Sequence, residues 1–136
     1  MNVTLRNPEN APRPAGPYSQ VGRVELGGGA LLFVSGQVAL DEAGEVVAPG
    51  DMAVQSREVM RSLDALLRAE GATLADVVSI RTFLTDMSRL PEYAAARREF
   101  LPGTPPTSTT VEVSALFRPG AVIEVEVVAA LPARAG

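Results

Sequence analysis

The segment Ala121–Leu131 (AVIEVEVVAAL) alternates apolar and charged side chains at its centre, which predicts a β-strand with two unlike faces. Three β-branched residues share one face: Ile123, Val125 and Val127. The other face carries Glu124, Glu126 and Val128. A sheet face that stays half apolar on a chain of 136 residues predicts contact with another subunit.

Two segments have helical spacing. Asp51–Glu70 repeats apolar residues along one stripe, with Asp51 as its N-cap and Gly71 as its stop. The residues of this stripe are Met52, Val59, Leu63, Leu66 and Leu67. Leu90–Phe100 predicts a shorter helix with Pro91 in its first turn.

The remaining periodic segments predict strands around these helices. The predicted strands are Val21–Leu26, Ala30–Leu40, Ala75–Thr85, Thr107–Ser114 and Ala121–Leu131. Residues 7–17 are rich in Pro and predict a loop, and Gly36 predicts a bulge or a close approach by another group. The order β-β-α-β-α-β-β predicts one α+β domain over residues 1–136, with a mixed sheet and both helices on one face.

The absence of Cys and His removes several chemistries. Thiol nucleophiles, His-based triads and disulfides are excluded, and we expect no metal site. The formal net charge of −4 argues against a nucleic-acid surface. The polar N-terminal segment and the short apolar runs predict a cytoplasmic protein without membrane contact.

Polar residues on two predicted strands are the first candidates for a site. Glu124 and Glu126 share one strand face, and Ser108, Thr110 and Glu112 share a face of the strand before it. If these two strands pair, the five side chains form a pocket wall with a general acid or base. The alternative is an ordinary solvated strand face.

Three further residues each have a functional and a structural interpretation. Tyr18 follows Gly-Pro and either contacts a ligand or anchors the N-terminal loop. Ser35, beside Gly36, either holds a ligand oxygen or is a satisfied strand residue. Arg118 either reaches a pocket at the strand ends or lies in solvent, and we expect Arg97 and Arg98 on a solvated helix face.

Several stretches together resemble the Rid/YjgF family of reactive-intermediate deaminases, also known as liver perchloric-acid-soluble proteins. These stretches are Ala11–Pro12, Gly16–Gln20, Phe33–Gln37, Gly44–Val47, Asp76–Val78, Thr82–Met87, Val111–Val113 and Ile123–Glu126. The resemblance implies a chorismate-mutase-like fold and a homotrimer in which three sheets form a central barrel. It also implies small-molecule pockets between subunits, in which enamines and imines are hydrolysed without a cofactor.

The resemblance assigns roles to individual residues. Tyr18 and Ser35 match pocket residues of the family, and Glu124 matches the Glu that positions water. Ser108, however, stands where deaminating members have a carboxylate-binding Arg, and Ala94 stands at a position that is often Asn. With Ser108 there, we expect a pocket of net negative charge that takes a neutral or cationic ligand, unless Arg118 replaces the lost charge.

The leading functional hypothesis is hydrolysis of a C=N metabolite with release of ammonia. Glu124 would polarise water, Ser108 and Thr110 would orient the substrate, and Tyr18 would close the pocket. The alternative is a non-catalytic trimer that binds a small molecule or regulates a partner enzyme. An endoribonuclease is a third hypothesis, against which the negative charge, the absent His and the sparse aromatic residues argue.

Overall fold

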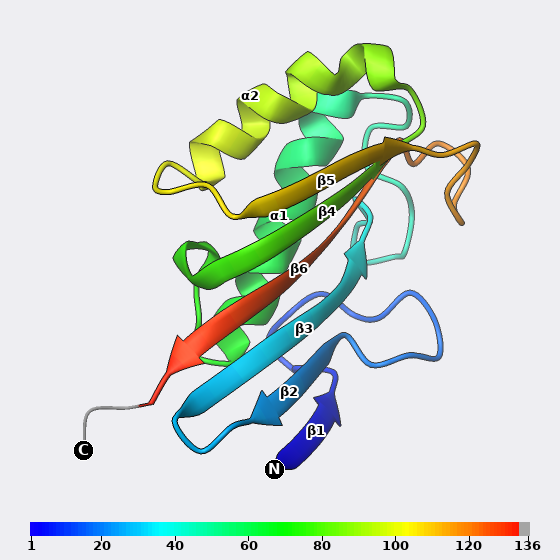
Figure 1. Ribbon diagram of the computed structural model, residues 1–136. Helices are drawn as coiled ribbons and strands as arrows, with labels where there is room; N and C mark the ends of the chain where they lie inside the picture. Colours follow the sequence, from blue (N-terminus) through cyan, green and yellow to red (C-terminus); the bar gives the residue numbers. More distant parts are fainter. Residues whose placement is uncertain (134–136) are drawn as a thin grey trace.

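The computed structural model describes residues 1–133, in which six strands form one sheet (Figure 1). The strands are β1 (Asn2–Arg6), β2 (Val21–Glu25), β3 (Gly29–Gln37), β4 (Val77–Leu84), β5 (Thr107–Glu112) and β6 (Ile123–Pro132). Their order across the sheet is β1-β2-β3-β6-β4-β5. Only β4 and β5 run parallel, so the sheet is mixed, as expected.

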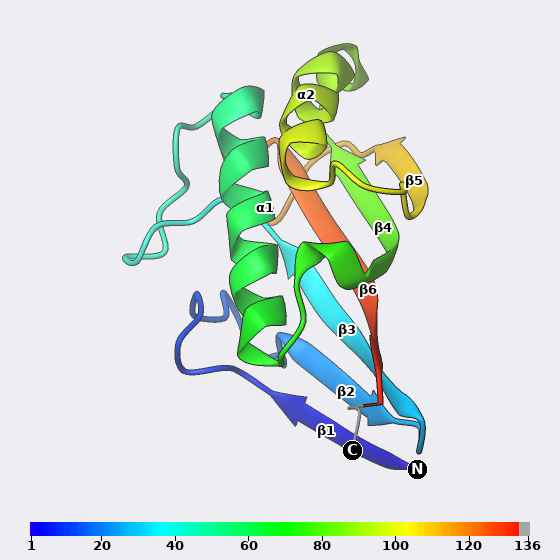
Figure 2. The same ribbon diagram turned by 90° about the vertical axis from the view of Figure 1, so that its left-hand side faces the viewer.

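Two helices cover one face of this sheet, α1 (Met52–Ala69) and α2 (Leu90–Phe100) (Figure 2). Asp51 caps α1 by accepting a hydrogen bond from the Val54 N–H (3.0 Å), and Gly71 follows the helix with a φ of 85°. Two 3-10 turns precede β4 and α2, at Leu74–Asp76 and Met87–Arg89. None of the helices in residues 1–133 combines the length and hydrophobicity needed to cross a membrane.

The core lies between α1 and the two central strands β3 and β6. All five residues of the predicted α1 stripe are fully buried, and so are Ile123 and Val125 on β6. At the other end of the core, α2 is joined to β4 by a hydrogen bond of 2.6 Å between the hydroxyls of Tyr93 and Thr82. This buried bond fixes α2 over the β4 side of the sheet.

Strand β1 was not predicted from the sequence, and the order of elements is therefore β-β-β-α-β-α-β-β. Its side chains are mostly exposed, so no buried stripe identifies it. It is held by pairing with β2 and by the buried Glu70 carboxylate, which forms ion pairs with Arg6 at 3.1 Å and with Arg23 at 3.4 Å. These ion pairs tie the first two strands to the end of α1.

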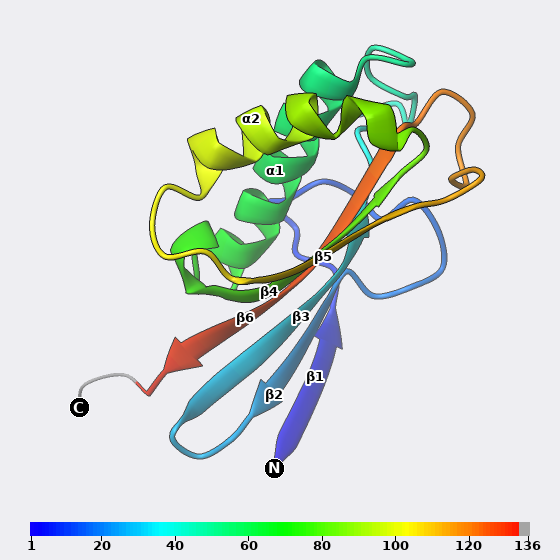
Figure 3. The same ribbon diagram turned by 45° about the horizontal axis from the view of Figure 1, so that its top comes forward.

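The sheet face away from the helices is covered by no other element among residues 1–133 (Figures 2 and 3). Val3, Leu5, Phe33 and Val111 remain exposed on it. We call this surface the open face. An apolar open face is what the sequence pattern predicts, and the expected contact with another subunit stays a prediction.

Candidate functional site

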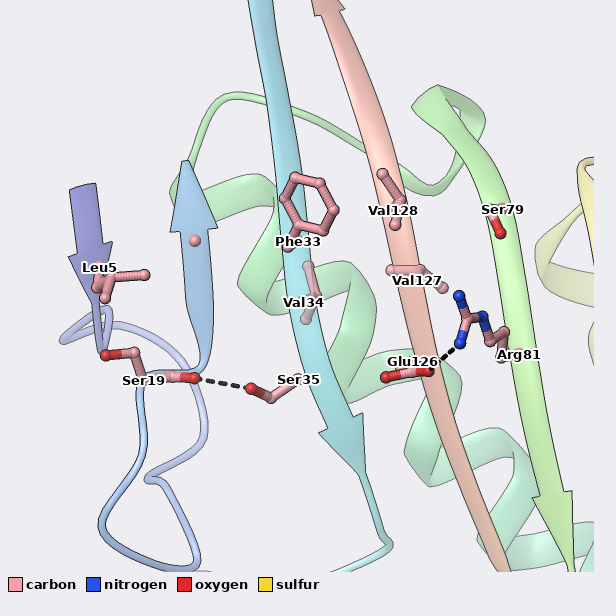
Figure 4. Close-up of a pocket in the computed structure, with 11 residues that line it drawn as sticks. Leu5, Ser19, Phe33, Val34, Ser35, Ser79, Arg81, Glu126, Val127 and Val128 are labelled. Atoms are coloured by element: carbon pink, nitrogen blue, oxygen red, sulfur yellow. Dashed lines mark hydrogen bonds and ion pairs between the residues drawn. The ribbon is translucent and has the colours of Figure 1, made fainter. Parts of the chain in front are cut away.

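The open face contains a shallow cavity of about 390 Å³ across β1, β2, β3, β6 and β4 (Figure 4). Its apolar lining includes Leu5, Phe33 and Val128, which lie in one row of the sheet register. Its polar lining includes Ser35, Arg81 and Glu126. The Arg81 guanidinium forms an exposed ion pair with the Glu126 carboxylate at 3.7 Å.

Glu124 lies on the same face of β6 as Glu126 and is half-buried. Burial raises the pKa of the Glu124 carboxyl, and the nearby charge of Glu126 raises it further. A carboxyl group with a raised pKa can give up and take back a proton nearer to neutral pH than an ordinary Glu. Glu124 is therefore suited to acid–base chemistry.

Gly36 allows Glu124 to lie where it does. A β-carbon at position 36 would be 2.5 Å from the Glu124 Oε2 atom and 2.8 Å from its Cδ atom. The pairing of β3 with β6 also shifts between Val34 and Gln37, so a bulge occurs at this point. Both the predicted bulge and the predicted close approach are confirmed.

Ser35 fastens the N-terminal loop to β3. Its hydroxyl donates to the Ser19 carbonyl oxygen at 2.7 Å (Figure 4). Its backbone N–H donates to the Gln20 carbonyl oxygen at 2.8 Å. Tyr18, which precedes Ser19 in the loop, is 40% exposed, and its ring lies against Gly16. The structural interpretation of Ser35 is thus supported, although Ser35 also lines the cavity.

Ser108 and Thr110 do not join Glu124, because β5 does not pair with β6. β4 lies between these strands, and the register aligns Ser108 with Ile80 and Thr110 with Thr82. Ile80 and Thr82 are buried beneath the helices, so Ser108 and Thr110 lie on the helical face. The predicted pocket wall, which required the last two strands to pair, therefore does not form within a single chain.

The chain crossing between β4 and β5 explains this arrangement. β4, α2 and β5 form a strand–helix–strand unit, whose two strands pair in parallel side by side. β6 then pairs with β3 and with the other side of β4. Glu112, at the end of β5, accepts a hydrogen bond from the Met87 N–H at 2.8 Å and stabilises the turn before α2.

Arg97 occupies the helical face beside Ser108. Its Nη1–H donates to Ser108 Oγ at 2.8 Å, and the side chain is partly buried. The expectation of a solvated helix face holds for Arg98, which is exposed, whereas Arg97 is partly buried and contacts β5 through an exposed hydrogen bond. The sequence spacing could have indicated this position, because Arg97 lies four residues after Tyr93 and therefore on the same side of α2.

Arg118 lies elsewhere. Its guanidinium stacks 5.7 Å from the ring centroid of Phe117 and lines a separate groove of about 1080 Å³. The other walls of that groove include residues 9–15, the loop 40–44 and part of α1. Arg97, rather than Arg118, thus supplies the guanidinium in contact with Ser108. Within residues 1–133, no group of three acidic side chains is arranged to hold a metal ion.

The chain is similar to known proteins over most of its length. The family model described as Endoribonuclease L-PSP matches residues 8–131. A RutC family protein of Sulfurisphaera tokodaii is 38% identical over 88% of this chain and 92% of its own. The 3-aminoacrylate deaminase RutC of Acinetobacter baylyi is 34% identical over 90% and 93%.

The fold comparison agrees with these relatives. The conserved Rid family protein YyfA of Yersinia pestis superposes with a TM-score of 0.82 at 33% identity, covering 94% of this chain and 98% of its own. This match confirms the expected α+β fold. The sequence relatives, the family model and the superposition together show that the chain belongs to the Rid/YjgF family.

Proposed function

We propose that this protein hydrolyses the C=N bond of small enamine or imine metabolites and releases ammonia. The observation that carries the proposal is the half-buried Glu124 carboxyl with its raised pKa, held over Gly36 on the open face. The similarity to a relative named 3-aminoacrylate deaminase supports the same reaction class.

Glu124 would act first as a base and then as an acid. Its carboxylate takes a proton from a water molecule while the water oxygen bonds to the imine carbon. The protonated Glu124 then gives that proton to nitrogen, which completes a carbinolamine. The carbinolamine hydroxyl next passes its proton to nitrogen through Glu124, and the C=O bond forms as the C–N bond breaks, so the products are a carbonyl compound and ammonia. An enamine enters the same sequence after a proton adds to its carbon and converts it to the imine. One residue can serve both steps because its pKa lies above that of an ordinary Glu.

We propose further that each site is assembled between two protomers of a homotrimer. Glu124 and Ser35 lie on the open face, whereas Ser108 and Thr110 lie on the helical face of the edge strand β5. One protomer cannot bring these groups together, but the open face of one protomer can meet β5 of its neighbour. The exposed apolar residues of the open face favour such a contact, and Tyr18 would cover the resulting pocket.

Ammonia release from freshly generated imines and enamines tests the reaction. The panel should include substrates with and without a carboxylate. We expect Glu124→Gln to lower kcat/KM by about 100-fold or more, the usual contribution of general acid–base catalysis. Glu126→Gln is the matched control on the same strand face, and we expect it to change the rate by less than about tenfold. Release no faster than in buffer across the panel would overturn the proposal.

A second candidate is a protein that binds a metabolite without converting it. The presence of Ser rather than Arg at position 108 on β5 favours this candidate, because Ser offers only one neutral donor. A thermal-shift screen distinguishes the two: a ligand that stabilises the protein and is recovered unchanged indicates binding alone. The negative net charge does not favour a ribonuclease.

A further inference from the structure

Arg97 reaches the edge strand β5 from α2. It lies one helical turn after Tyr93, whose hydroxyl is bonded to Thr82 in the core. Its own Nη1–H donates to Ser108 Oγ at 2.8 Å. A long side chain anchored at both its backbone and its head group loses little further freedom when it binds a ligand. The guanidinium is therefore prepositioned at the β5 edge.

The charge of Arg97 is not compensated. The ion pairs within residues 1–133 involve seven other arginines: Arg6, Arg23, Arg57, Arg61, Arg68, Arg81 and Arg89. Glu99, two residues further along α2, forms its ion pair with Arg57 on α1, at 3.0 Å. Arg97 thus keeps a full positive charge and several unused N–H donors beside a hydroxyl.

Ser108 adds a second donor to this guanidinium. Because its oxygen accepts from Arg97, its own O–H proton can point away, toward a ligand. Ser108 is exposed on the edge strand, so a ligand can reach both groups. One N–H from Arg97 and one O–H from Ser108 match the two oxygens of a carboxylate, with one of the two hydrogen bonds assisted by charge.

We propose that Arg97 and Ser108 form a carboxylate-binding subsite and that Arg97 makes the protein selective for substrates with a carboxylate next to the C=N bond. This inference rests on the proposed function, because it assigns the substrate class of the same intersubunit site. It replaces the expectation, drawn from Ser108 alone, of a neutral or cationic ligand. The guanidinium that β5 lacks is supplied by the neighbouring helix.

Kinetics with a matched pair of substrates tests the selectivity. The pair is 2-aminoacrylate and its primary amide, which differ only in the charged group. We expect Arg97→Gln to lower kcat/KM for 2-aminoacrylate by roughly 10- to 100-fold, as for loss of a charged hydrogen bond, and to leave the amide within about threefold. Arg97→Lys should be intermediate, since it keeps the charge but loses the planar fork. Arg98→Gln, on the adjacent exposed residue, is the control.

Binding of a product-like ligand tests the subsite without catalysis. Pyruvate should stabilise the wild-type protein in a thermal-shift titration, whereas pyruvamide should do so much less. Arg97→Gln should abolish that difference and Arg98→Gln should retain it. If pyruvate fails to stabilise the wild type, or if both variants behave alike, the subsite is overturned even when ammonia release is observed. If pyruvate binds through Arg97 but no substrate is hydrolysed, the subsite stands and the proposed reaction fails.

Discussion

Replacement of Gly36 by alanine tests whether the position of the Glu124 carboxylate matters for the reaction. The added β-carbon would lie 2.5 Å from Oε2, 2.8 Å from Cδ and 3.0 Å from Cγ of Glu124. Ordinary contacts to a β-carbon begin at 3.4 Å, so the carboxyl group must move by roughly 1 Å or change rotamer. The backbone at Gly36 is not in the left-handed region, so no strain of that kind is added.

A displacement of about 1 Å at a reacting group can cost about 100-fold in rate. We therefore expect kcat/KM of Gly36→Ala for 2-aminoacrylate to fall by that factor in a coupled ammonia assay. The free energy of unfolding should fall by only about 1 kcal/mol, the cost of an off-rotamer side chain. The large loss of rate and the small loss of stability separate displacement of the carboxylate from unfolding.

Two further variants complete this experiment. Gly28→Ala is the matched control, because no atom lies within 4 Å of the β-carbon it would add. Gly36→Ala combined with Glu124→Asp shortens the side chain by one methylene and should recover part of the lost rate. A Gly36→Ala protein that works at the wild-type rate would refute the role assigned to the Glu124 position.

Three other predictions concern stability. The folded protein raises the pKa of the Glu124 carboxyl, so the stability that this group contributes is present below about pH 4.5 and is lost as the pH rises through its folded pKa. Urea unfolding should therefore show that Glu124→Gln is more stable than the wild-type protein at pH 7 but not at pH 4. Thr82→Val and Tyr93→Phe should each cost about 1–3 kcal/mol, and the double variant less than their sum, because each single change leaves one buried hydroxyl unpaired. Asp51→Ala should cost about 1 kcal/mol through loss of the α1 cap, measured by the same unfolding assay; an unchanged midpoint would contradict this.

Local patterns in the sequence were sufficient for the elements with a clear periodicity. The α1 stripe, the alternation in β6 and the bulge at Gly36 follow from side-chain spacing and from what glycine permits. Strand β1 has no such pattern, because pairing and ion pairs hold it rather than an apolar face.

Strand neighbours were not predictable in the same way. A period of two says which side chains share a face, but not which strand lies next to which. The position of β5 depends on the crossover through α2, and that crossover turns Ser108 toward Arg97 and away from Glu124. The role of Arg97 required this tertiary contact, although its spacing from Tyr93 already placed it on the inward side of α2.

The placement of Glu124 and Ser108 on opposite faces of one sheet has a genetic consequence. If each site is formed by two neighbouring protomers, a substitution on one face of a protomer inactivates only the site to which that face contributes. Glu124→Gln and Arg97→Gln chains, each impaired towards 2-aminoacrylate, would then complement each other when unfolded and reassembled together. With random mixing, about one site in four would draw both halves from intact surfaces and regain wild-type turnover.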